Sequence, residues 1–169
     1  MHIMFVCTGN ICRSPMGELL MSRYLANTTV QVTSAGTRGL PMHQIDPSSA
    51  RLMDSVGIDS SGFRSRRLTR EMAESADLIL CFEAAQRKEI VTIAPMAVRS
   101  SFIRPLIAAP KDIADPHGRE FAKFRQAAEE TNRALRMILT SMRKHYRVES
   151  APVRPQITRP DFDSIIYAS

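Results

Sequence analysis

The chain has 169 residues, of which 44% are hydrophobic and 24% are charged, and its formal net charge is +6. Such a chain is long enough to bury one core and too apolar for an intrinsically disordered protein. The basic residues form no run with interleaved aromatic residues, so the charge favours an anionic ligand, and no nucleic-acid partner is expected.

The N-terminal apolar run ends at Val6, which is too early for a signal peptide, and no stretch reaches the length of a transmembrane helix. We therefore expect neither secretion nor membrane insertion. Cys7, Cys12 and Cys81 form no disulfide framework, and neither they nor the four histidines have the spacing of zinc ligands. The sequence thus predicts a cytoplasmic protein with reduced thiols and without a metal or cofactor.

Strand and helix patterns alternate in the first half of the chain. His2–Val6 is an apolar run typical of a buried parallel strand, and Thr29–Ala35 is a second candidate strand. Between them, Ser14 is predicted to be the N-cap of a helix whose first turn contains Pro15. A second helix is predicted to begin after Asp46, which is again an N-cap residue type followed by a proline.

The second half of the chain continues the alternation. Ala76–Phe82 is a predicted buried strand, Ala84–Ile93 a predicted helix and Val98–Ile103 a candidate fourth strand. Between Glu120 and Lys144 the apolar positions step by three and four, which predicts a long amphipathic helix. The alternation favours an α/β domain with a parallel sheet, in which right-handed crossovers place helices on both faces.

The C-terminal segment differs in composition from the rest of the chain. Residues 147–169 contain three prolines and no periodic apolar face. This pattern is typical of an extended or disordered tail. The predicted organisation is therefore one domain over residues 1–146, followed by this tail.

The sequence CTGNICRSP joins the first predicted strand to the first predicted helix. Ligands of open α/β sheets bind beyond the carboxyl ends of strands, where backbone N–H groups and a helix N-terminus favour an anion. Gly9 and Asn10 tolerate the left-handed backbone that such a loop needs, and Arg13 can hold two oxygens of a phosphate. The loop is therefore a candidate phosphate-binding site.

Cys7 lies at the base of this candidate site. Surroundings that favour an anion also stabilise a thiolate, which is the nucleophilic form of cysteine. Attack of the thiolate on a bound phosphoryl group would form a phosphocysteine intermediate. The leaving oxygen then needs a proton donor and the second step needs a base, and Asp115, stiffened by Pro116 ahead of the last helix, is the candidate for both roles.

These residues together resemble the low-molecular-weight protein tyrosine phosphatases. Residues 7–13 fit the pattern C-x5-R, and they are joined by Ser14-Pro15, by the segment at 34–37 (SAGT) and by Asp115-Pro116, so that the likeness covers about residues 1–146. It implies an open, single-domain, four-stranded parallel sheet flanked by helices, and phosphomonoester hydrolysis without a metal. The implied phosphate-binding residues are Thr8, Gly9, Asn10, Ile11, Cys12 and Ser14.

The resemblance also implies roles for single side chains. Cys7 would be the nucleophile, Arg13 the phosphate clamp and Asp115 the general acid and then base. Asn10 and Ser14 would brace the loop, and the Ser14 hydroxyl would help the thiolate leave. Ser34 would belong to the same network.

Several positions depart from the family pattern or refine it. Phe63 stands where a bracing histidine is often found, and Leu40 and His117 stand near positions that often carry an aromatic wall of the substrate crevice. Ile11 is apolar, as in relatives that act on phosphotyrosine, whereas relatives resembling arginine phosphatases carry threonine there. Cys12 is either a packing residue or a thiol that captures oxidised Cys7 as a disulfide.

The residues leave two alternatives to a phosphatase. The first is an arsenate reductase that uses a small-molecule thiol, and the second is a non-catalytic phosphate-binding regulatory module. For a phosphatase the resemblance implies a tyrosine-phosphorylated protein as partner. In bacteria, relatives of this size often oppose a tyrosine kinase of polysaccharide export.

Overall fold

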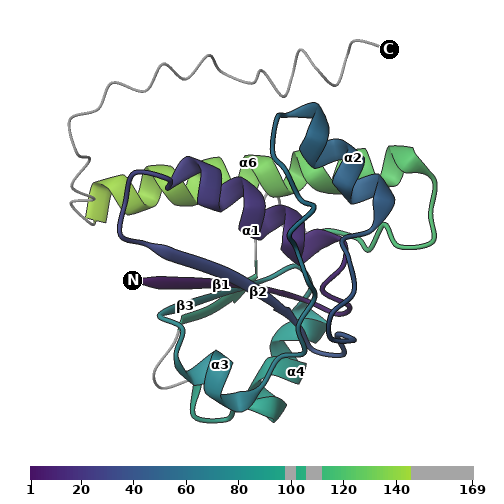
Figure 1. The fold of residues 1–169 in the computed structure, drawn as a ribbon. Helices are drawn as coiled ribbons and strands as arrows, with labels where there is room; N and C mark the ends of the chain where they lie inside the picture. The colour runs from purple at the N-terminus through teal and green to yellow at the C-terminus, as the bar shows by residue number, and fades with distance from the viewer. Residues whose placement is uncertain (98–101, 106–111, 146–169) are drawn as a thin grey trace.

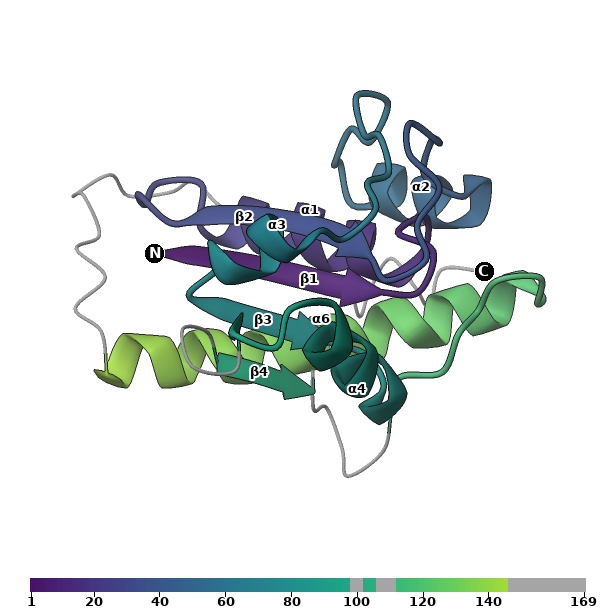
Figure 2. The same ribbon diagram turned by 90° about the horizontal axis from the view of Figure 1, so that it is seen from below.

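The computed structural model describes residues 1–97, 102–105 and 112–145 of the chain. Four parallel strands form one sheet in the order β2-β1-β3-β4. Figure 2 shows their arrows pointing the same way, so that their carboxyl ends meet at one edge of the sheet. The strands are β1 (His2–Cys7), β2 (Gln31–Gly36), β3 (Leu78–Cys81) and β4 (Phe102–Pro105).

Helices cover both faces of the sheet (Figure 1). One face carries α1 (Arg13–Tyr24), α2 (Pro47–Ser55) and α6 (Phe121–His145), and the other carries α3 (Arg70–Glu74) and α4 (Ala84–Ile93). The predicted α/β domain with a parallel sheet is therefore confirmed. Among the described residues, no helix is both long and apolar enough to span a membrane.

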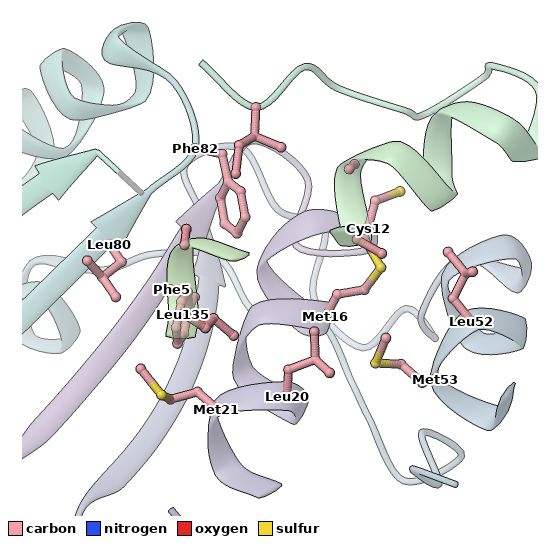
Figure 3. Packing of buried hydrophobic residues seen from close by; sticks show 14 of the residues in the cluster. Phe5, Cys12, Met16, Leu20, Met21, Leu52, Met53, Leu80, Phe82 and Leu135 are labelled. Carbon is pink, nitrogen blue, oxygen red and sulfur yellow. The ribbon is translucent and has the colours of Figure 1, made fainter. Parts of the chain in front are cut away.

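Successive residues of β1 alternate between two apolar cores, as the period of a strand requires. Ile3 and Phe5 belong to the larger core beneath α1, α2 and α6, whereas Met4 and Val6 belong to the smaller core beneath α3 and α4. Figure 3 shows the larger core, where side chains of α1 and α2 pack together above the sheet. A Cβ at Gly17 would lie 2.6 Å from the ring of Phe5, so this glycine lets α1 approach β1 closely.

Most element boundaries agree with the sequence predictions. The helix predicted at 84–93 is α4, the long helix predicted at 120–144 is α6, and Asp46 caps α2 by accepting a hydrogen bond from Ser48 N over 2.9 Å. The predicted strand at 98–103 overlaps β4 at residues 102 and 103, and its first four residues lie outside the described part of the chain. The predicted tail at 147–169 also lies outside it.

The prediction for the start of α1 was wrong in one respect. The helix begins at Arg13 with Cys12 as its N-cap residue, and no side chain caps it. Ser14 is buried inside the first turn, where its hydroxyl contacts Cys7 and Asn10. Serine is a common N-cap residue because its hydroxyl can accept a hydrogen bond from the first turn of a helix, but here that hydroxyl contacts Cys7 and Asn10.

Candidate active site

Residues 7–13 connect β1 to α1, from the last residue of the strand to the first residue of the helix, and are called here the β1–α1 loop. Asn10 within the loop has a φ of 55°, a left-handed conformation that asparagine tolerates better than most residues. The loop is tied to the chain beyond β2, because the backbone N–H of Arg38 donates to the carbonyl of Thr8 over 2.9 Å. A Cβ at Gly36 would lie 2.6 Å from that same carbonyl, so only glycine permits this approach.

The sulfur of Cys7 lies at the base of the loop and is almost completely buried. Its Sγ is 3.0 Å from Ser14 Oγ and accepts a hydrogen bond from Asn10 N over 3.3 Å. Ser14 Oγ also accepts a hydrogen bond from Asn10 Nδ2 over 2.8 Å, so its single proton is donated either to the sulfur or, over 3.4 Å, to the carbonyl of Ala35. Both contacts would stabilise a thiolate at this position.

Asn10 is the centre of the bracing network. Its Nδ2 donates to Ser34 Oγ over 2.8 Å as well as to Ser14, and its Oδ1 accepts from the backbone N–H of Arg66 over 2.7 Å. Ser34 in turn donates to Glu18, a carboxyl group whose pKa is raised by burial. The network therefore links the loop to α1, to β2 and to the segment around Arg66.

The family resemblance predicts that Phe63 stands where relatives often have a bracing histidine. The ring of Phe63 is partly buried against the larger apolar core. Both ends of the Asn10 side-chain amide nevertheless have partners. Its Nδ2 donates to Ser14 and Ser34, and its Oδ1 accepts from the backbone N–H of Arg66. A backbone group thus holds Asn10 from this segment of the chain.

Replacing Asn10 with alanine is expected to lower the free energy of unfolding by about 2–4 kcal/mol, because three side-chain hydrogen bonds are lost and two of the partners, the hydroxyls of Ser14 and Ser34, stay buried. Chemical denaturation measures this change. Asn132→Ala is the matched control, because Asn132 is also buried and its side chain accepts a single hydrogen bond from the described part of the chain, that of Tyr24. Equal losses in the two variants would contradict a central role for Asn10.

Arg13 is 1% exposed and its guanidinium is held from several sides. Nη1 donates to Glu83 and, over 2.8 Å, to the carbonyl of Ile113, while Nη2 lies 2.8 Å from Asp115 Oδ2. Nε is buried and has no hydrogen-bond partner among the described residues. A buried arginine with one unpaired donor beside a loop of backbone N–H groups fits an anionic ligand.

Glu83 and Gln86 contribute to the site and were not predicted. Glu83 is the N-cap residue of α4 and contacts Arg13, and Gln86 Nε2 donates to Thr8 Oγ1 over 3.3 Å. A signal for Glu83 was available, because it directly follows the third predicted strand. In a parallel sheet that position lies at the same edge as the β1–α1 loop.

Asp115 reaches the site from the loop before α6. Its side chain is 45% exposed, with Oδ2 toward Arg13 and Oδ1 accepting from the backbone N–H of His117 over 3.2 Å. Asp115 lines a cavity of about 220 Å³ together with Cys7, so the fold brings the predicted acid and nucleophile to one pocket. The other lining residues are Thr8, Gly9, Ile11, Cys12, Arg38, Leu40, His43 and His117.

The three thiols differ in their surroundings. Burial raises the pKa of the Cys12 thiol far above its usual range, and the negative charges of Asp46, Cys7 and Asp115 raise it further. Burial likewise raises the pKa of Cys81 to about 11. Cys12 and Cys81 therefore keep their protons at neutral pH and are poor nucleophiles there.

Comparison with known proteins places this site in a family. The family model described as low molecular weight phosphotyrosine protein phosphatase matches residues 2–148. The chain is 39% identical over 133 residues to a probable low molecular weight protein-tyrosine-phosphatase, EpsP of Ralstonia nicotianae, covering 79% of this chain and 90% of that protein. It is 31% identical over 152 residues to a protein-arginine-phosphatase of Bacillus subtilis, covering 87% and 100%.

A solved structure agrees with this placement. The Erwinia amylovora tyrosine phosphatase AmsI superposes with a TM-score of 0.77 at 25% identity, covering 83% of this chain and 91% of that one. This chain therefore shares its overall fold with that phosphatase, and its β1–α1 loop follows a strand of the parallel sheet. The chain therefore belongs to the low-molecular-weight phosphotyrosine protein phosphatase family.

Proposed function

We propose that the protein hydrolyses phosphotyrosine in protein substrates through a phosphocysteine intermediate. The observation that carries this proposal is the pocket itself, where Cys7, hydrogen-bonded through its sulfur, and Asp115 line one cavity beside the β1–α1 loop. Arg13 contacts Asp115 directly and keeps an unpaired Nε. These three side chains are the proposed nucleophile, acid and anion clamp.

In the first step the Cys7 thiolate attacks phosphorus, a sulfur–phosphorus bond forms and the bond from phosphorus to the tyrosine oxygen breaks. Asp115 in its protonated form gives its proton to that leaving oxygen. The backbone N–H groups of the loop and Arg13 hold the remaining phosphate oxygens, where charge develops in the transition state.

In the second step the Asp115 carboxylate takes a proton from water, and the water oxygen attacks phosphorus. The sulfur–phosphorus bond breaks, inorganic phosphate is released and Cys7 leaves as a thiolate. Ser14 Oγ, 3.0 Å from the sulfur, donates its proton into a hydrogen bond that stabilises this leaving group. Asp115 is then protonated for the next cycle.

The proposed preference for phosphotyrosine rests on the apolar side chains of the pocket. Ile11 and Leu40 line the cavity, and Leu40 is 63% exposed at its rim. Apolar surface of this kind packs against a phenyl ring, whereas a phosphorylated guanidine group needs polar partners. The pocket therefore favours an aryl phosphate.

Purified protein in the presence of a chelator is expected to hydrolyse a phosphotyrosine peptide with a kcat/KM at least about tenfold above that for phosphoarginine. Ile11→Thr is expected to reduce this ratio, because it replaces an apolar wall of the pocket with a polar one. Faster turnover of phosphoarginine by the parent chain would reassign the substrate. Arsenate-dependent consumption of a small-molecule thiol, without peptide hydrolysis, would indicate an arsenate reductase instead.

We infer a tyrosine-phosphorylated protein as the partner, and the family resemblance suggests a bacterial tyrosine kinase of polysaccharide export. Dephosphorylation of such a purified kinase is the direct measurement. The inferred cytoplasmic location agrees with the state of the three cysteines, none of which forms a disulfide bond. Free thiols are usual in a reducing compartment.

A further inference from the structure

Three side chains with metal-ligating atoms meet beside the β1–α1 loop, and each comes from a different part of the chain. Cys12 precedes α1, Asp46 precedes α2, and His117 lies in the loop before α6. Cys12 Sγ and His117 Nδ1 are 3.9 Å apart, and His117 Nδ1 and Asp46 Oδ2 are 3.8 Å apart. All three ligand atoms lie within 4.8 Å of one another, so they face one common space.

These separations are close to those of a zinc site. At the usual Zn–S, Zn–N and Zn–O bond lengths, tetrahedral ligand atoms lie roughly 3.4–3.6 Å from one another. The Cys12–His117 and His117–Asp46 separations exceed that range by a few tenths of an ångström. The ligand atoms of Cys12 and Asp46 also lie within 4.8 Å of each other, so side-chain rotations would bring the three atoms to bonding distance of one ion.

The surroundings hold two of the ligands in place and leave access to the third. Asp46 Oδ1 is fixed by the N–H of Ser48, so its other oxygen, Oδ2, is the one that faces His117. Cys12 is buried at the base, the Asp46 side chain is 16% exposed and the His117 side chain is 61% exposed. Zinc sites with three protein ligands often keep a water molecule as the fourth ligand, and the exposed side of this cluster leaves room for one.

We propose that Cys12, Asp46 and His117 bind a zinc-type divalent cation that inhibits the enzyme from the wall of its pocket. On binding, the Cys12 thiol loses its proton to solvent and forms a sulfur–metal bond, while neutral His117 and ionised Asp46 donate lone pairs. No atom changes oxidation state. The two negative ligands balance the charge of the ion.

Inhibition follows from where the ligands lie, and this part of the proposal rests on the proposed phosphatase activity. Cys12 and His117 line the cavity that contains Cys7, so the ion occupies space beside the nucleophile. His117 also donates its backbone N–H to Asp115. An ion that holds the His117 side chain restrains Asp115, the proposed acid.

The binding experiment uses Zn²⁺ and Co²⁺ with a Cys7→Ser variant of the full chain, so that the nucleophile cannot ligate the ion. Calorimetry is expected to show one Zn²⁺ per chain, and Co²⁺ is expected to give a thiolate-to-metal charge-transfer band. The remaining thiols are Cys12 and Cys81, and Cys81 is completely buried in β3. No metal binding by this variant would overturn the proposal.

Three further substitutions, each added singly to the Cys7→Ser variant, identify the ligands. His117→Ala removes an exposed side chain, Cys12→Ala removes the thiol, and Asp46→Ser removes the carboxylate while retaining a helix-capping hydroxyl. Each is expected to weaken Zn²⁺ binding at least about tenfold, as loss of a metal contact does. His43→Gln is the matched control, because His43 lines the same cavity but is not one of the three proposed ligands. The variant that carries both Cys7→Ser and His43→Gln should bind Zn²⁺ with the affinity of Cys7→Ser alone. Unchanged affinity in His117→Ala would overturn the assignment.

The inhibition experiment uses the chain with Cys7 intact and an aryl phosphate. Zn²⁺ is expected to inhibit hydrolysis, a chelator to restore it, and His117→Ala to require at least about tenfold more Zn²⁺ for the same inhibition. Equal sensitivity of His117→Ala and the parent would overturn the inhibitory role. Absence of hydrolysis with chelator present would refute the phosphatase proposal alone, because the Cys7→Ser binding measurements are independent of turnover.

Discussion

Cys7→Ser is expected to lower turnover of a phosphotyrosine peptide by about 10³-fold or more, while inorganic phosphate still binds with nearly its parent affinity. A serine hydroxyl is not ionised at neutral pH, so the variant lacks the nucleophile. Its oxygen can still contact Ser14 and Asn10, which contact the sulfur in the parent chain. The loop and Arg13 should therefore keep their positions.

Steady-state kinetics and calorimetry with inorganic phosphate separate these two effects. Cys81→Ala is the control variant, because Cys81 lies in β3 and does not line the cavity. It should keep the turnover of the parent chain. A Cys7→Ser variant that turned over substrate like Cys81→Ala would exclude the phosphocysteine mechanism.

Asp115→Asn is expected to lower kcat for phosphotyrosine by about 10²–10³-fold, because an amide cannot protonate the leaving oxygen or activate water. Substrate binding should be retained, since the substitution removes a negative charge from a pocket that binds an anion and frees Arg13 Nη2. The loss should be smallest for aryl phosphates whose leaving group is a weak base. Such leaving groups depart without a proton.

A series of aryl phosphates with leaving groups of different pKa measures this dependence. Asp112→Asn is the matched control, because Asp112 lies three residues earlier and accepts a hydrogen bond from Ala84 N over 3.1 Å outside the cavity. Its kcat should equal that of the parent for every leaving group. If Asp115→Asn behaved in the same way, another group would have to be the acid.

The features predictable from the sequence are those that depend on neighbouring residues. The run before Cys7 and the helical spacing after Glu120 each depend on a local period, and the parallel sheet follows from their alternation. The β1–α1 loop was recognisable because its residues are contiguous. Its backbone conformation at Asn10 follows from residue type, and the structure has it at a φ of 55°.

The features that were missed depend on contacts between distant parts of the chain. The N-cap role predicted for Ser14 was wrong, because the helix begins one residue earlier, at Arg13, whereas the Ser14–Cys7 contact implied by the resemblance is present. The five-residue helix α3 is too short to show an apolar period. Cys12 and His117 are brought together only by the fold, so their spacing along the chain could not predict this contact.

The hydrogen bond from the Arg66 backbone to Asn10 has a consequence for how this protein can diverge. A main-chain amide is the same in every residue type except proline, so the tether survives replacement of the side chain at position 66. The side chain at position 66, which also lies 3.9 Å from Glu18, can therefore be replaced without loss of this hydrogen bond to the β1–α1 loop. Proline is the exception, because it has no backbone N–H and would remove the hydrogen bond to Asn10.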